Sequence, residues 1–331
     1  MKNIMIVVML IAGQAHSRAF NFILDYIGGT PPTNSIGGGS LSNCMFAAAQ
    51  TWALAIRDQG TMLVHFGWDT NGGAYSYMNA QGGSPDRVIE GTIMFGTKPG
   101  SFTWYLDSTP LECEQATNYY VHADNIGGGL INDARYMTWP TTNTQFDAET
   151  TALHELGHLL GLVYGYSNYV AQSQNTNILI TSGQFAGSVV PLQSGPNGVV
   201  AHIKFMLISW DAVPLMSSGT PNPGQRIFPS DLDIATDAQI SGFSQINYGL
   251  NPILGITGPV PQRDIDPTSS SKKLVMALSW IQPLGGVYQV QQSSDLYSWQ
   301  AASATIMDNG GNYSAIIPYA PTYSMFYRLK R

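Results

Sequence analysis

The segment HELGHLLG, residues 154–161, constrains this chain more than any other, because its two histidines can act together only on a helix. His154 and His158 are four residues apart, so on a helix their imidazoles project from the same face. Gly161 follows the last apolar residues of the segment and is a natural helix end. We therefore predict a helix over residues 144–160 that presents both imidazoles on one side.

Two imidazoles on one helix face, with a carboxylate beside them, are typical of a catalytic metal site. His154 and His158 can bind one zinc ion, and Glu155 can reach a water molecule bound to that ion. Zinc lowers the pKa of such a water to roughly 7, and Glu155 would act as the general base that takes its proton during attack on a carbonyl. The alternative is a buried helix whose histidines only form hydrogen bonds, since three fixed positions also occur by chance.

A catalytic zinc site needs a third protein ligand and one open position. No glutamate follows Glu155, which excludes the class of site that takes a downstream glutamate as its third ligand. Of the upstream histidines His65 and His122, His65 falls in a predicted strand away from the helix. The candidates downstream of the helix are His202, Tyr164 and Asp211.

HELGHLLG and the later stretch VPLMSSG, residues 213–219, resemble parts of one known family. The family is that of the metzincin zinc peptidases, whose motif HExxHxxGxxH is followed by a methionine turn. Tyr164 stands where the motif has its third histidine. In one branch, the leishmanolysin-like peptidases and related bacterial secreted enzymes, a long insertion separates the second and third histidines. His202, 44 residues after His158 and 14 before Met216, fits that layout.

The resemblance spans roughly residues 40–245 and implies an α+β fold. In that fold a twisted sheet packs with the HExxH helix, and an irregular lower subdomain completes the domain. The Zn²⁺ ligands that the resemblance implies are His154, His158 and His202. Met216 would form an apolar floor under the metal and would not be a ligand. Tyr164 would be structural, and a phenol that faces the metal is the alternative.

The function implied by the resemblance is that of a secreted zinc metalloendopeptidase. Such an enzyme hydrolyses protein or peptide substrates by Glu155-assisted attack of a zinc-bound water. A different class of protein is the alternative: a catalytically inactive, secreted binding or adhesion protein that retains the peptidase scaffold. Tyr164 and the long irregular stretch 162–201 motivate this second interpretation. The two interpretations differ in where His202 lies relative to the other two histidines.

Composition divides the chain into four parts. They are a signal peptide over residues 1–19, the metzincin-like domain over 20–250, a linker over 251–273, and a small all-β sandwich over 274–331. Lys2 gives the first part a positive charge, and the apolar run that follows is too short to span a bilayer. We therefore expect a protein that is secreted to the extracellular space or the periplasm.

Local patterns predict further elements. Apolar residues at helical spacing predict a helix over 46–57, and TMLVHFGW predicts a strand over 61–68. The tripeptide at 229–231, Pro-Ser-Asp, is a typical helix start. Thr144 and Asp147 are expected to cap the helix that carries HELGH. The predicted strands of the last part cover 274–280, 287–292, 299–306, 313–317 and 325–329.

Charge and composition exclude several classes of partner. The net charge is −7 and no basic run is present, so nucleic acid is not an expected partner. No second apolar run reaches membrane length, so no membrane span is expected.

Cys44 and Cys113 form either a disulfide or two buried thiols. Calcium could bind to the side-chain oxygens of Asp124, Asn125, Asn132 and Asp133. The alternative is that these residues form a solvated turn. No nucleotide cofactor is expected, because the glycine runs lack phosphate-binding spacing.

Overall fold

The computed structural model describes most of the chain. The described ranges are residues 20–97, 103–111, 118–138, 145–173, 176–195, 198–204, 213–218, 223–251, 256–263, 274–281, 289–293, 300–303, 305–308, 312–318 and 326–330. Several sequence predictions lie outside these ranges, among them the signal peptide at 1–19, the candidate ligand Asp211, the cap residue Thr144 and the thiol of Cys113. The thiol of Cys44 is free and buried.

The protein mixes helices with several sheets, as the α+β prediction required. The helices are α1 (Leu41–Ala55), α2 (Ala148–Leu160), α3 (Ser167–Gln172) and α4 (Asp231–Ser241). The strands up to α4 are β1 (Asn21–Gly28), β2 (Thr61–Asp69), β3 (Ala74–Gly82), β4 (Arg87–Gly96), β5 (Thr103–Tyr105), β6 (Asn118–Asn125), β7 (Leu130–Thr138), β8 (Gln145–Asp147), β9 (Asn177–Leu179), β10 (Val189–Gly195), β11 (Gly198–Ile203) and β12 (Gln225–Phe228). The later strands are β13 (Leu250–Asn251), β14 (Ile256–Arg263), β15 (Leu274–Ile281), β16 (Gln289–Ser293), β17 (Gln300–Ala301), β18 (Thr305–Asp308), β19 (Asn312–Pro318) and β20 (Phe326–Lys330).

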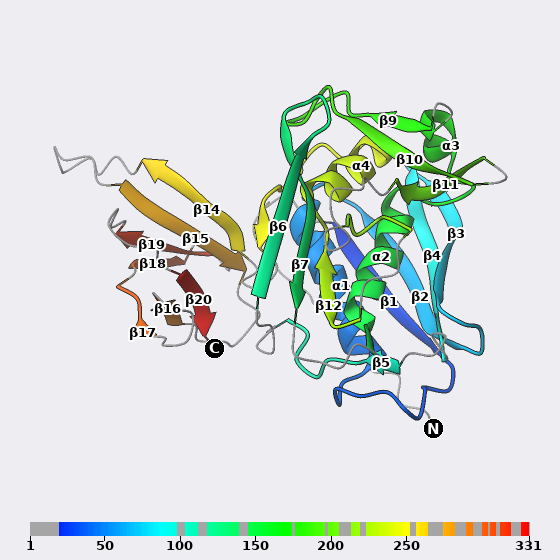
Figure 1. Cartoon of the computed structure of the whole chain (residues 1–331), viewed down its shortest axis with the longest axis horizontal. Coiled ribbons are helices and arrows are strands. Elements are labelled where there is room, and N and C mark those ends of the chain that lie inside the picture. Colours follow the sequence, from blue (N-terminus) through cyan, green and yellow to red (C-terminus); the bar gives the residue numbers. More distant parts are fainter. Residues whose placement is uncertain are drawn as a thin grey trace.

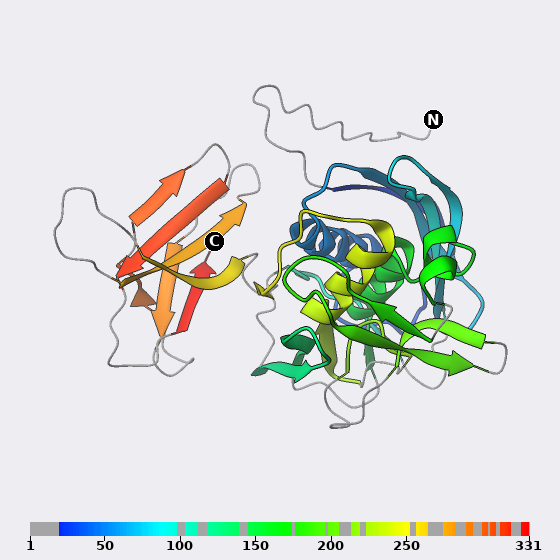
Figure 2. The ribbon, with the colours of Figure 1, turned by 90° about the horizontal axis from the view of Figure 1, so that it is seen from above.

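A four-stranded sheet with the order β1-β2-β4-β3 forms one wall of the main unit (Figure 1). Strands β1, β2 and β4 run parallel, and the edge strand β3 runs antiparallel to β4. Helix α1 is the crossover between the parallel strands β1 and β2, as such a connection requires. Helices α1 and α2 lie together on one side of this sheet (Figure 2).

The hydrophobic core fills the space between the sheet and these two helices. Trp52 of α1 is fully buried, and its ring nitrogen donates a hydrogen bond of 2.9 Å to the carbonyl oxygen of Leu153 in α2. Helix α2 approaches β4 closely, since a Cβ placed on Gly91 would lie 2.6 Å from methyl carbons of Leu159. The sheet and α1 therefore fix the position and rotation of α2.

The first residues of helices α1 and α2 differ from the predicted ones. Helix α2 begins at Ala148, four residues later than predicted, because Asp147 is its N-cap and accepts from the Thr150 amide at 2.9 Å. Helix α1 covers 41–55 and not 46–57, because Ser40 caps it five residues earlier. The predicted strand over 61–68 corresponds to β2.

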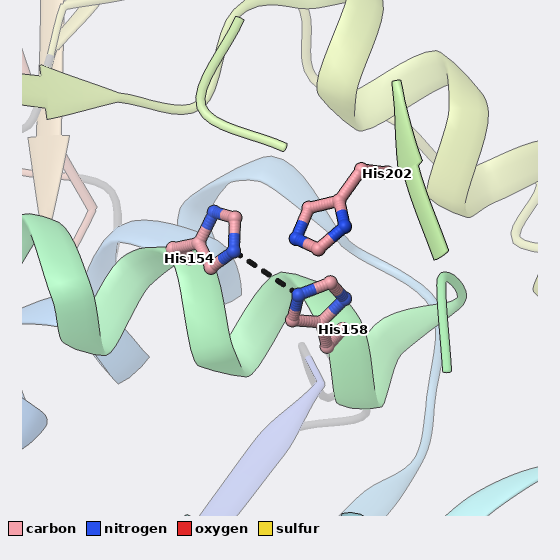
Figure 3. Close-up of side chains that lie close together, drawn as sticks. All are labelled: His154, His158 and His202. Atoms are coloured by element: carbon pink, nitrogen blue, oxygen red, sulfur yellow. Dashed lines mark hydrogen bonds between the residues drawn. The ribbon is translucent and has the colours of Figure 1, made fainter. Parts of the chain in front are cut away.

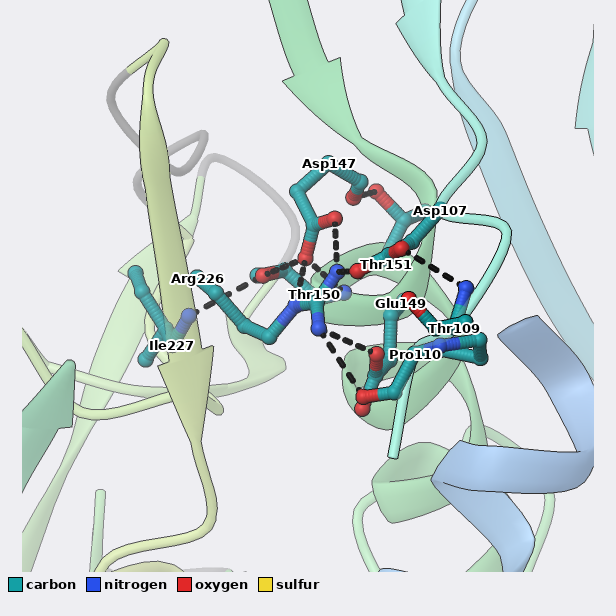
Figure 4. A network of polar contacts seen from close by, with 9 residues as sticks. All are labelled: Asp107, Thr109, Pro110, Asp147, Glu149, Thr150, Thr151, Arg226 and Ile227. Carbon is teal, nitrogen blue, oxygen red and sulfur yellow. Dashed lines mark hydrogen bonds and ion pairs between the residues drawn. The ribbon is translucent and has the colours of Figure 1, made fainter. Parts of the chain in front are cut away.

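A fully buried ion cluster fastens the start of α2 to the neighbouring elements (Figure 4). Arg226 of β12 lies 2.9 Å from Asp147, 2.9 Å from Asp107 and 2.8 Å from Glu149. It also donates to the carbonyl oxygen of Pro110 at 3.1 Å. All four side chains are 0–2% exposed. The cluster therefore connects α2, β12 and the loop after β5 in a region without solvent screening.

The strands after α4 form two sheets, in the orders β13-β14-β15-β19-β18 and β17-β16-β20. Strand β14 lies inside the stretch 251–273 that was expected to be a linker. It pairs antiparallel with β15, from Thr257 opposite Ser279 to Arg263 opposite Leu274. The register of this pair shifts between Thr257 and Val260, where Pro259 lies, whereas Pro261 pairs opposite Met276 in the regular part of the ladder. Among the described residues, no helix is long and apolar enough to cross a membrane.

Candidate metal centre

The two histidines of α2 are held in one tautomer by backbone carbonyls. His154 Nδ1 lies 2.6 Å from the Leu215 oxygen, and His158 Nδ1 lies 2.7 Å from the Leu162 oxygen. A carbonyl oxygen only accepts, so Nδ1 carries the proton in both rings. The Nε2 atom of each neutral ring then presents a lone pair, which is the arrangement found in metal-binding histidines.

The two Nε2 atoms face each other at 3.0 Å (Figure 3). With both Nδ1 atoms protonated, neither Nε2 of the neutral rings has a hydrogen to share, and two lone pairs at this distance repel. A cation between them removes the repulsion. Two nitrogens of a tetrahedral zinc site, each about 2.0–2.1 Å from the metal, lie roughly 3.3 Å apart. The spacing in α2 is close to that value.

His202 completes the group from a distant part of the chain. It lies on β11, and its ring centroid is 5.3 Å from that of His154 and 4.8 Å from that of His158. One ligand atom from each of the three residues lies within 4.8 Å of the other two. Within the ranges that the structure describes, this is the one such group of histidine, cysteine, aspartate and glutamate side chains. Three histidines are thus close enough to bind one metal ion.

Burial keeps two of these imidazoles neutral. It lowers the pKa of His158 well below its ordinary value, and the nearby His154 and His202 lower it further. Burial also lowers the pKa of His202 to about 4, with a smaller contribution from His154. Neutral imidazole is the form that binds metals, so at neutral pH no proton competes at these two rings.

The segment Leu215–Met216 holds two of the three histidines. The Leu215 oxygen accepts from His154, and the Met216 oxygen accepts from the amide of Ile203, next to His202, at 2.8 Å. The segment itself is fixed by Asp233 of α4, whose carboxylate accepts from the Leu215 amide at 3.1 Å and from the Met216 amide at 2.9 Å. One carboxylate therefore orients two imidazoles through the backbone.

Met216 is fully buried beside α2. A Cβ placed on Gly157 would lie 2.3 Å from Met216 Sδ, so the glycine makes room for this thioether. The Pro-Ser-Asp pattern predicted the start of α4. There, Asp233 and Ser230 form a capping box. The contact from Asp233 to Leu215 and Met216 left no signal in the sequence, because the residues are 18 and 17 positions apart.

Glu155 faces the interior beside the histidines. Its side chain is buried, and its Oε2 accepts a hydrogen bond of 2.7 Å from the hydroxyl of Ser76 on β3. Burial raises the pKa of Glu155, while His154 and the Ser76 hydrogen bond lower it. Ser76 was not among the residues that the sequence singled out, because nothing local marks a serine 79 residues away from its partner.

The remaining candidate ligands lie elsewhere or are engaged in other contacts. Tyr164 is 62% exposed in the turn after α2. His65 lies between Asp25 and Glu90, at 2.8 and 3.2 Å, on three neighbouring strands. Among the residues considered for calcium, Asp133 contacts His122 at 2.6 Å and Asn132 donates to Asp231 at 2.9 Å. Comparisons of the chain with models of protein families, with curated proteins and with solved structures found no match.

Proposed function

We propose that the protein is a zinc-dependent endopeptidase that acts on proteins or peptides after export from the cell. The observation that carries the proposal is the pair of Nε2 atoms 3.0 Å apart, with both Nδ1 protons donated to carbonyls and a third imidazole beside them. A carboxylate, Glu155, follows the first of these histidines directly. This combination supports hydrolysis more than it supports a purely structural metal.

The donor set fits zinc. Three neutral imidazoles leave one position of a tetrahedral ion open, which distinguishes catalytic from structural zinc sites. His154, His158 and His202 would hold the ion. When bound, zinc supplies a Lewis acid that polarises a carbonyl and makes a water molecule more acidic.

The chain's own residues account for proton movement. Glu155 would take a proton from the attacking water and later pass it to the amine that leaves. Its buried carboxylate lies in the same region as the imidazoles and is not committed to any arginine or lysine in the described residues. The raised pKa of Glu155 suits this role, because a base must also be able to release its proton as an acid.

The sheet offers a place for an extended peptide. Strand β3 is the edge of the β1-β2-β4-β3 sheet, and its free edge pairs with no other strand among the described residues. Helix α2 packs against β3 and Ser76 of β3 contacts Glu155, so this edge borders the metal centre. An extended peptide can add to such an edge through backbone hydrogen bonds, which supports a peptide substrate.

The deciding experiment combines metal analysis with hydrolysis. We expect purified protein to contain about one zinc per chain and to cleave a peptide library, and we expect Glu155→Gln to retain the zinc while losing at least 100-fold in kcat. A protein that contains zinc but cleaves nothing would be a binding or adhesion protein on this scaffold. A protein without stoichiometric zinc would remove the basis of the proposal.

A further inference from the structure

Ser76 occupies the position on β3 from which a side chain reaches Glu155. Side chains alternate along the strand, and the flanking Tyr75 and Tyr77 are exposed and stack on each other. Ser76 between them is half-buried and points the other way, to the interior that contains α2. The hydroxyl of Tyr75 donates to Asp69 at 2.6 Å, so it is not directed at Glu155.

The contact is selective for one carboxylate oxygen. The Ser76 hydroxyl donates to Oε2 of Glu155 at 2.7 Å, which is typical of a charge-assisted hydrogen bond. A serine hydroxyl has one proton to donate, so Oε1 receives none from Ser76. The carboxylate is thereby fixed about its last torsion, which is otherwise broad for glutamate.

We propose that Ser76 is a positioning residue that binds Oε2 and so reserves Oε1 of Glu155 as the oxygen that exchanges the proton. This inference rests on the proposed peptidase function. The position of Ser76 in the fold supports this proposal. Ser76 lies opposite Ile93 in the β3–β4 ladder, and α2 packs against both strands. A rigid sheet therefore holds the donor, and a rigid helix holds the acceptor.

The proton balance follows from this assignment. Water gives one proton to Oε1 as its oxygen forms a bond to the scissile carbonyl carbon. The proton then moves from Oε1 to the amide nitrogen as the carbon–nitrogen bond breaks, and the amine leaves. Ser76 keeps its own proton throughout and donates to Oε2 before and after each transfer. Its contribution is orientation, which should appear in kcat and not in substrate binding.

The test uses Ser76→Ala, which removes the donor, and Ser76→Thr, which keeps a hydroxyl at the same carbon. Ser35→Ala is a matched control, because it removes a hydroxyl bound at 3.2 Å to Pro32 in a loop. For Ser76→Ala we expect kcat to fall about 10- to 100-fold, the loss typical of a hydrogen bond to a charged group. We expect KM and zinc affinity, measured by competition with a chelator, to stay within about twofold of wild type. Ser76→Thr should recover most of kcat.

A second measurement separates this inference from the peptidase function. Crystal structures of the zinc-loaded wild type and of Ser76→Ala should show one Glu155 conformer in the first and altered or multiple conformers in the second. If wild type hydrolyses no peptide, the proposed function fails, while the Glu155 conformers still decide the positioning role. Unchanged kcat in Ser76→Ala overturns the inference, as does a parallel loss of zinc affinity or an unchanged, single Glu155 conformer.

Discussion

Replacing Glu149 by glutamine tests whether the buried ion cluster limits stability at high pH. Three carboxylates surround the single guanidinium of Arg226, and none of the four side chains is more than 2% exposed. Burial raises the pKa of Glu149 to about 8, Arg226 opposes this, and Asp147 and Asp107 add to it. At neutral pH the folded protein therefore holds Glu149 mainly as the neutral acid.

The magnitude follows from linkage between protonation and folding. An ordinary glutamate has a pKa of about 4.3, so a folded value of about 8 costs about 5 kcal/mol of stability once both states are ionised, at about 1.36 kcal/mol for each pKa unit. Protonation of Glu149 favours the folded state at low pH. This contribution to the free energy of unfolding is lost as pH rises from about 4.3 to about 8, because Glu149 ionises first in the unfolded chain. Between pH 7 and 9 the remaining loss is roughly 1.4 kcal/mol, or about 3–6 °C in Tm.

The assay is thermal and urea unfolding of wild type and Glu149→Gln at pH 7, 8 and 9. We expect the stability of the variant relative to wild type to rise by roughly 1.4 kcal/mol across this range, since glutamine does not ionise. The comparison cancels the pH dependence of metal binding, which both proteins share. Asp124→Asn, a carboxylate outside the cluster, should leave the slope unchanged. A stability difference that is constant from pH 7 to 9 would refute the reasoning, because Glu149 would then be ionised in the folded state throughout.

Three further substitutions test the metal centre. His202→Ala should lower zinc affinity at least 100-fold in a chelator competition, and retained affinity would remove it as a ligand. Asp233→Asn replaces one of two acceptor oxygens with a donor facing a backbone amide, so zinc affinity should fall about 10- to 100-fold although Asp233 does not touch the metal. Gly157→Ala places a Cβ 2.3 Å from Met216 Sδ, so unfolding should show a loss of about 1–3 kcal/mol. The double variant Gly157→Ala with Met216→Ala should recover part of that loss.

The parts of the site that the sequence predicted are those encoded locally. The spacing of His154 and His158 predicted a shared face of one helix, and Gly161 predicted the helix end. The Pro-Ser-Asp pattern predicted the start of α4. His202 was one of three candidates by elimination and the one favoured by the resemblance, and the structure brings it to the other two histidines.

The remaining features depend on contacts between distant residues. Arg226 lies within residues 40–245, the span of the resemblance, yet its partner Asp107 is 119 positions away. Ser76 lies 79 residues from Glu155. The strand β14 was missed for another reason. The proline content of residues 251–273 predicts a linker, yet Pro259 lies at a shift in the ladder and Pro261 pairs opposite Met276.

The placement of His202 beside the two histidines of α2 explains how this group forms without a histidine at position 164. A histidine in the turn after α2 would be positioned by the few residues that connect it to the helix. His202 is positioned across the fold instead, because the next residue, Ile203, donates to the Met216 oxygen at 2.8 Å and forms a parallel bridge with Ser217. The same segment accepts from His154 through Leu215. His154 and His202 thus share one support, so the chain between them can be long and Tyr164 can face solvent while the three histidines stay together.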